Sequence, residues 1–275
     1  MPYFKNQEGY NLYYENINAD SESYTIILLH GFASSASFFK SQIKILKKDY
    51  RILAFDALGH GRSDHPKDVN LSKNLRYDII RDLEDLLKYL EIKAQYGIIG
   101  HSLVGGMIGQ LFTMKHPEKI KFLILMNSGY IIIDNVIRNI FYNLLPYEIR
   151  INFLEIVANS IEHILDKTIP FIITALSDSL EGIKLTKDEL FMKIEEQIFN
   201  MVNEINEYDP SHISCPTLIM GGRLDNFAPG RMSEELHKKI PNSNLEIVDM
   251  AGHFMPAQRA DEINKAILDF ISKLS

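Results

Sequence analysis

Short runs that are apolar at almost every position alternate with longer helical patterns along most of the chain, and this alternation limits the possible folds more than any other feature. The run at 24–29 is the clearest, and others lie at 52–55, 96–99 and 122–126. A strand with no polar face is typical of a parallel sheet that is buried on both sides. Strands that alternate with helices form such a sheet, with helices on both faces. The sequence therefore predicts an α/β fold.

Eight strands are expected in total. They are predicted at 3–5, 11–15, 24–29, 52–55, 96–99, 122–126, 217–220 and 245–248. The first two flank a turn at Glu8-Gly9, so we expect them to pair as an antiparallel hairpin at one edge of the sheet. Apolar residues at helical spacing predict helices at 71–90, 103–112 and 258–274.

The strand patterns disappear between residues 131 and 206, and several helical patterns replace them. A capping box at 186–189 introduces one apolar stripe, which consists of Leu190, Ile194, Ile198, Val202 and Ile205. We therefore expect 131–206 to be an all-helical cap inserted between two parts of one core, 1–130 and 207–275. Its apolar side chains can pack the helices together or line a pocket for an acyl chain, and the sequence leaves both open.

Composition and charge narrow the class of protein. Apolar residues make up 46% of the chain and charged residues 24%, as in ordinary globular proteins. The formal charge is −7 and the basic residues are scattered, which argues against nucleic-acid binding. Cys215 is the only cysteine, so no intramolecular disulfide can form, and we expect it to be buried. No apolar run reaches the length of a membrane span and no signal peptide precedes the first strand, which predicts a cytoplasmic location.

Ser102 has the local context of a hydrolase nucleophile. Gly100-His101-Ser102 joins a predicted strand to a predicted helix, as in the GxSxG elbow, but Val104 stands where that pattern has glycine. A serine in such a turn can also be a simple helix cap. To act as a nucleophile it needs a base, an acid that orients the base, and donors for an oxyanion.

An acid and a base follow two later strands. Asp225 comes after the strand at 217–220 and His253 after the strand at 245–248. Ligand sites of open α/β sheets gather at the carboxyl ends of strands, so these side chains can meet Ser102 there. Asp249 is a second candidate for the acid, because it ends a strand only four residues before His253.

Five segments in this order resemble the α/β-hydrolase fold family. They are LLHGF at 28–32, FDALGHGRSD at 55–64, GHS at 100–102, CPTLIMGGRLDNFAP at 215–229 and AGHF at 251–254. The resemblance implies Ser102 as nucleophile, His253 as general base and then acid, and Asp225 as the orienting carboxylate. It also implies an oxyanion hole formed by the backbone N–H groups of Phe32 and Leu103.

Other conspicuous residues in these segments are interpreted as scaffold. We expect His30, Asp56 and His60 to hold turns beside the site by hydrogen bonds. His101, beside the nucleophile, can pack or touch a ligand. In some relatives the acid follows the strand before the cap, but Asn127 occupies that place here and no carboxylate is present.

Val104 raises the question of whether the elbow is intact. Either Gly105, Gly106 and Gly109 let the helix approach the sheet despite the valine, or the elbow is damaged. We predict that Ser102 has a positive φ, as a nucleophile elbow requires.

The resemblance implies a serine hydrolase that cleaves carboxylic esters through an acyl-enzyme, a carboxylesterase that needs no cofactor and no metal. Its expected partner is a small-molecule ester with an apolar acyl group. The same residues also suit a C–C bond hydrolase, a thioesterase, a lactonase or a perhydrolase. Serine at position 102 argues against epoxide-hydrolase and haloalkane-dehalogenase chemistry, which uses a carboxylate nucleophile. A ligand sensor with slow or no turnover is the alternative from another class.

Overall fold

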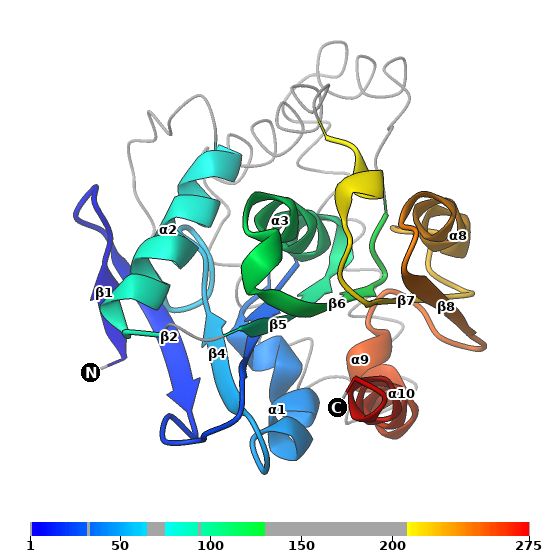
Figure 1. The fold of residues 1–275 in the computed structure, drawn as a ribbon, viewed down its shortest axis with the longest axis horizontal. Helices are drawn as coiled ribbons and strands as arrows, with labels where there is room; N and C mark the ends of the chain where they lie inside the picture. The colour runs from blue at the N-terminus through cyan, green and yellow to red at the C-terminus, as the bar shows by residue number, and fades with distance from the viewer. Residues whose placement is uncertain (1, 32–33, 65–74, 93–94, 130–207, 275) are drawn as a thin grey trace, which may run out of the picture.

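The computed structural model describes residues 2–31, 34–64, 75–92, 95–129 and 208–274. One sheet of eight strands crosses the molecule in the order β1-β2-β4-β3-β5-β6-β7-β8 (Figure 1). The strands are β1 Tyr3–Lys5, β2 Asn11–Ile17, β3 Thr25–Leu29, β4 Arg51–Phe55, β5 Tyr96–His101, β6 Ile120–Met126, β7 Thr217–Gly222 and β8 Ser243–Val248. Only the pairs β1·β2 and β2·β4 are antiparallel. The predicted eight-stranded, mostly parallel sheet is confirmed.

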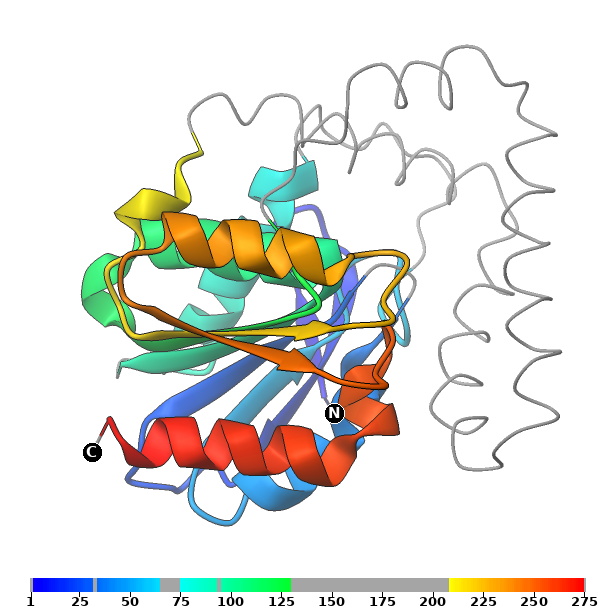
Figure 2. The same ribbon diagram turned by 90° about the vertical axis from the view of Figure 1, so that its right-hand side faces the viewer.

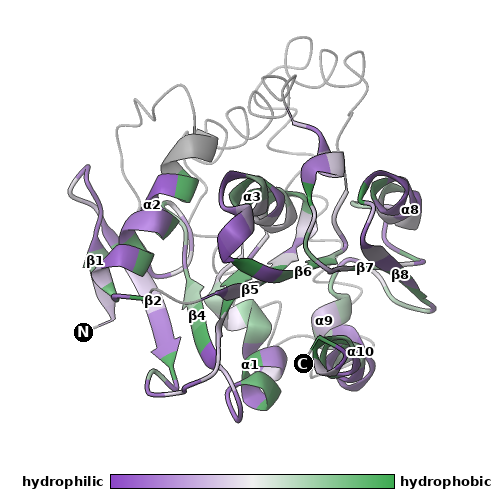
Figure 3. Cartoon of the chain, viewed as in Figure 1, coloured by the Kyte–Doolittle hydropathy of each residue, from purple (hydrophilic) through white to green (hydrophobic). Residues whose placement is uncertain are grey.

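Helices cover both faces of the sheet, which explains why its central strands carry no polar face. One face carries α2 Leu75–Tyr89, α3 Ser102–Lys115 and α8 Gly230–Lys239, and the other carries α1 Lys40–Leu46, α9 Met255–Gln258 and α10 Ala260–Ser272 (Figures 1 and 2). Strands β3, β5 and β7 are buried at every position. Apolar residues accordingly concentrate in the middle of the sheet and on the helix surfaces that contact it (Figure 3).

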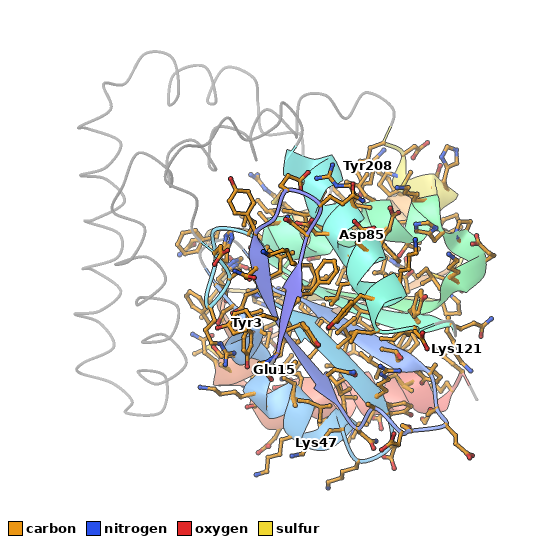
Figure 4. The ribbon with its side chains drawn as sticks, turned by 90° about the vertical axis from the view of Figure 1, so that its left-hand side faces the viewer. Tyr3, Glu15, Lys47, Asp85, Lys121 and Tyr208 are labelled. Carbon is orange, nitrogen blue, oxygen red and sulfur yellow. The ribbon has the colours of Figure 1, made fainter. Side chains whose placement is uncertain are left out.

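The N-terminal hairpin has the predicted form. Strand β1 is the edge strand and pairs with β2 so that Tyr3 lies opposite Tyr13. Gly9 stands in the turn with a φ of +89°, a conformation that favours glycine. Figure 4 shows this edge of the molecule, with Tyr3 on β1 and Glu15 on β2.

The helices differ from expectation in two ways. The last predicted helix, at 258–274, corresponds to α10 Ala260–Ser272, and the short α9 Met255–Gln258 before it was not predicted. In addition, no prediction covers α1 or α8. The only residues buried on α8 are Ser233 and Leu236, so its apolar pattern is too sparse to stand out in the sequence.

Residues 130–207 lie outside the described part of the chain, and with them lie the predicted cap at 131–206, its capping box and its apolar stripe. The described chain resumes at Tyr208, whose hydroxyl donates a hydrogen bond to Gln110 of α3 (Figure 4). Cys215 is buried as predicted, and burial raises the pKa of its thiol to about 11. Among the described residues, no helix is long and apolar enough to cross a membrane.

Candidate active site

The turn between β5 and α3 has the geometry of a nucleophile elbow. Ser102 has a φ of +65°, so the predicted positive φ is confirmed. A serine in this left-handed region is strained by about 1–3 kcal/mol, a cost that proteins retain mainly at functional sites. Gly100 makes the sharp turn possible, because a Cβ there would lie 2.6 Å from the carbonyl oxygen of Gly105.

Val104 does not separate the helix from the sheet. Its side chain is 6% exposed and belongs to the apolar cluster that also contains Leu29 and Met107. The close approach falls instead on Gly105, where a Cβ would overlap the carbonyl oxygens of Leu29 and His30. Of the two readings of this elbow, the geometry supports the one in which the later glycines accommodate the valine.

Ser102, His253 and Asp225 form one continuous chain of hydrogen bonds. The hydroxyl of Ser102 donates to Nε2 of His253 at 2.9 Å, and Nδ1 of His253 donates to Oδ2 of Asp225 at 2.7 Å. Their strands β5, β7 and β8 run parallel in one sheet, so the three residues meet at the same edge although Ser102 and His253 are 151 positions apart. An imidazole held in this way can take a proton from the serine hydroxyl.

Asp225 is buried and fully engaged. Its side chain has no exposed surface, and Oδ1 accepts the backbone N–H groups of Phe227 and Ala228 at 2.8 and 2.9 Å. These bonds fix the orientation of the carboxylate so that Oδ2 faces His253. Asp249, the other candidate acid, has a side chain that is 75% exposed and pairs with Arg223. The geometry therefore favours Asp225 as the partner of His253.

Of the two expected oxyanion donors, the structure describes Leu103 but not Phe32. Leu103 lies in the first turn of α3, where backbone N–H groups have no acceptor within the helix. Its N–H is therefore available beside Ser102. Phe32, the second expected donor, lies outside the described residues.

The residues interpreted as scaffold hold the loops beside the site. His30 donates from Nδ1 to the carbonyl oxygen of Gly31 at 2.7 Å and accepts the N–H of Ala57 on Nε2 at 3.1 Å. The buried carboxylate of Asp56 accepts the N–H groups of Ala36 and Arg62 at 2.7 and 2.8 Å. These contacts tie the loops after β3 and β4 together.

His60 belongs to the same loop region. Its Nδ1 lies 3.1 Å from the carbonyl oxygen of Leu58, and its ring is 5.2 Å from that of His30. Within the described ranges, no group of three or more His, Cys, Asp or Glu side chains could hold a metal ion.

Asn127 connects the ends of three strands, a role that the sequence analysis missed. The residue follows β6 directly, is fully buried and has a φ of +48°. Its Oδ1 accepts the N–H of Gly222 at 2.7 Å, and its Nδ2 donates to the carbonyl oxygens of Gly252 and His253 at 3.0 and 2.7 Å. The available signal was its position, directly after a buried strand between those that carry Ser102 and Asp225.

Two neutral histidines beside the site make stability depend on pH. Burial lowers the pKa of both His30 and His101 below the ordinary value, and for His101 the nearby His253 adds to the effect. Below pH about 6.5 the unfolded chain therefore binds protons that the folded chain does not. We expect the free energy of unfolding to be largest above this pH and to fall on acidification, by up to about 1.4 kcal/mol per pH unit for each histidine.

Urea unfolding at pH 7.5, 6.5 and 5.5 measures this dependence. The variant His101→Gln removes one of these two histidines. Below pH about 6.5 it should reduce the slope of the unfolding free energy against pH by up to about 1.4 kcal/mol per pH unit. An identical dependence in the native chain and in this variant would contradict a neutral, buried His101.

Comparison with known proteins identifies the family of this chain. The family model described as "alpha/beta hydrolase fold" matches residues 24–260. The uncharacterized hydrolase YugF of Bacillus subtilis (strain 168) is 27% identical over 271 residues, which cover 96% of this chain and 95% of YugF. A 2-hydroxy-6-oxo-6-(2'-aminophenyl)hexa-2,4-dienoic acid hydrolase of Metapseudomonas resinovorans is 25% identical over 256 residues, or 90% and 84% of the two chains.

A solved structure shows the same fold. The esterase EaEST from Exiguobacterium antarcticum superposes with a TM-score of 0.75 at 19% identity, over 98% of each chain. The family match spans the core strands from β3 to β8 and includes Ser102, Asp225 and His253. The chain belongs to the alpha/beta hydrolase fold family.

Proposed function

We propose that this hydrolase is a serine carboxylesterase that works through an acyl-enzyme. The observation that carries the proposal is the unbroken hydrogen-bond chain from Ser102 through His253 to Asp225, with Ser102 at a positive φ. A simple helix cap needs neither feature. A ligand sensor that keeps the same three residues differs from this proposal in showing negligible ester turnover.

In the proposed mechanism Ser102 attacks the ester carbonyl while His253 takes its proton. His253 then protonates the leaving alcohol, and in the second half of the cycle it activates a water that releases the acid. Asp225 holds the Nδ1–H tautomer of His253 and stabilises the imidazolium. The N–H groups of Leu103 and Phe32 are the proposed oxyanion donors.

Exposed apolar side chains on the loops that carry Asp225 and His253 support an ester with an apolar group. The ring of Phe227 lies 5.2 Å from that of His253 and is 55% exposed. Leu224 and Met250 are also largely exposed, and the loops that carry them are joined by a hydrogen bond from Leu224 N–H to the carbonyl oxygen of Ala251. A hydrocarbon group that packs against these residues is removed from contact with water. This burial stabilises the complex by about 25 cal/mol per Å² of apolar surface.

Two measurements on the purified chain test the proposal. A fluorophosphonate should label Ser102, and peptide mass spectrometry identifies the modified residue. A series of p-nitrophenyl esters from acetyl to palmitoyl should be hydrolysed with an optimum that gives the length of the acyl site. Labelling at another serine, or no turnover of any ester, would contradict the proposal.

Hydrolysis of a C–C bond is the second candidate function, because the Metapseudomonas relative is named as a hydrolase of a hexadienoic acid. The same serine, histidine and aspartate serve both reactions. Labelling of Ser102 without ester turnover would favour this candidate, and assays with a vinylogous diketone acid would then test it.

A further inference from the structure

The backbone carbonyl of His253 accepts hydrogen bonds from two buried side chains. Nδ2 of Asn127 donates to this oxygen at 2.7 Å, and Nε2 of His101 lies 2.9 Å from it. Both side chains belong to strand ends, β5 for His101 and β6 for Asn127. These two bonds hold the His253 peptide against the ends of two strands.

The protonation of His101 follows from its surroundings. Its ring is 2% exposed and stacks on Phe38 at a centroid distance of 4.3 Å. A carbonyl oxygen can only accept, so Nε2 must carry the hydrogen. Nδ1 has no hydrogen-bond partner among the described residues and is then an unprotonated acceptor of the neutral ring. Burial and the nearby His253 lower the pKa of His101 well below its usual value, in agreement with this neutral form.

His101 provides a short connection between the nucleophile and the base. It precedes Ser102 in the chain, so the backbone that sets the direction of the serine hydroxyl also carries the donor to His253. The hydrogen bond from Ser102 to Nε2 of His253 closes a small ring of contacts with this one. Without the His101 bond, the distance between the two catalytic groups would depend on the packing of β5 to β8 and on Asn127.

We propose that His101 is a positioning residue: its Nε2–H holds the His253 peptide so that the imidazole stays within proton-transfer distance of Ser102. The inference rests on the proposed function, because it assumes that Ser102 and His253 react. It assigns a task to a side chain that touches no substrate in the proposed mechanism. A misplacement of about 1 Å in such a site can lower the rate about 100-fold.

Two substitutions separate the hydrogen bond from the packing. His101→Phe keeps a flat ring against Phe38 and removes the donor, whereas His101→Gln removes the ring and keeps an N–H at nearly the same reach. We expect His101→Phe to lower kcat by about 10- to 100-fold with KM changed less than about threefold, and His101→Gln to stay within about threefold of the native kcat. His101→Leu carries the same expectation as His101→Phe if the phenylalanine variant does not fold.

A second comparison excludes a purely structural effect. In a chain that already carries His253→Ala, the residual turnover should change less than about twofold when His101→Phe is added, because the residue to be positioned has lost its reacting group. Thermal unfolding of every variant checks that it is folded at the assay temperature.

Three results would overturn the inference: native kcat in His101→Phe, an equal loss in His101→Gln, or the same loss with and without the His253 imidazole. Ser102→Ala is measured in parallel. If that variant keeps its turnover, the proposed function itself has failed. If it is inactive while His101→Phe is fully active, only the positioning role has failed.

Discussion

Replacing Ser102 with alanine is expected to lower kcat for the best ester on the order of 10⁴- to 10⁶-fold, the range found when a serine hydrolase loses its nucleophile. In the proposed mechanism this hydroxyl attacks the substrate carbonyl, and it is hydrogen-bonded to the chain of His253 and Asp225. Substrate binding does not need this oxygen, so KM should change far less than kcat. Steady-state kinetics on the ester with the highest native rate measure both values.

The control for this prediction is Ser128→Ala. Ser128 is also buried, near α3, and its hydroxyl has no hydrogen-bond partner in the described part of the chain. Its removal should leave kcat within about twofold of the native value. Comparable rates for the native chain and Ser102→Ala would reject the nucleophile assignment, and a loss in Ser128→Ala as large as in Ser102→Ala would show that the assay responds to general damage.

Asp225→Asn is expected to lower kcat about 10⁴-fold, as replacement of a triad aspartate by asparagine does. The amide oxygen can keep the two backbone bonds from Phe227 and Ala228, which turns the amide nitrogen towards His253. His253 must then accept on Nδ1 and carry its hydrogen on Nε2. In that tautomer it cannot take the proton of Ser102.

Asp249→Asn is the matched control, because it makes the same chemical change four residues before His253. Its side chain is exposed and its partner is Arg223, so we expect kcat to stay within about twofold of the native value. Loss of this surface pair should lower the free energy of unfolding by less than about 1 kcal/mol. Kinetics and thermal unfolding of the two variants decide between the acids. A larger loss in Asp249→Asn than in Asp225→Asn would reverse the assignment.

The sheet was predictable because burial on both faces leaves a direct record in the sequence. Every residue of β3 is buried, and the apolar run at 24–29 predicted it to within one residue. Strand β8 lies at the opposite edge from β1 and is only partly buried, so the strand predicted at 245–248 covered just its last four residues. Helix α8 presents few apolar residues to the core and left no comparable record.

The candidate triad was predictable for a different reason. Each member follows a strand of the parallel sheet, so the strand pattern alone brings Ser102, Asp225 and His253 to one edge. The choice between Asp225 and Asp249 required the resemblance, because both follow strands. The contact between His101 and the carbonyl of His253 could not be predicted, since it joins a side chain to a backbone oxygen 152 positions away and depends on no residue type at the second site.

The position of the base after the edge strand has a consequence for the newly made chain. Ser102 is translated 151 residues before His253, so the nucleophile candidate leaves the ribosome before the candidate base has been synthesised. A domain generally folds as a unit, so the sheet is complete only after β8 has been synthesised. Under the proposed mechanism the nascent protein is inactive until β8 joins the sheet, and a chain truncated before β8 would carry Ser102 without its base.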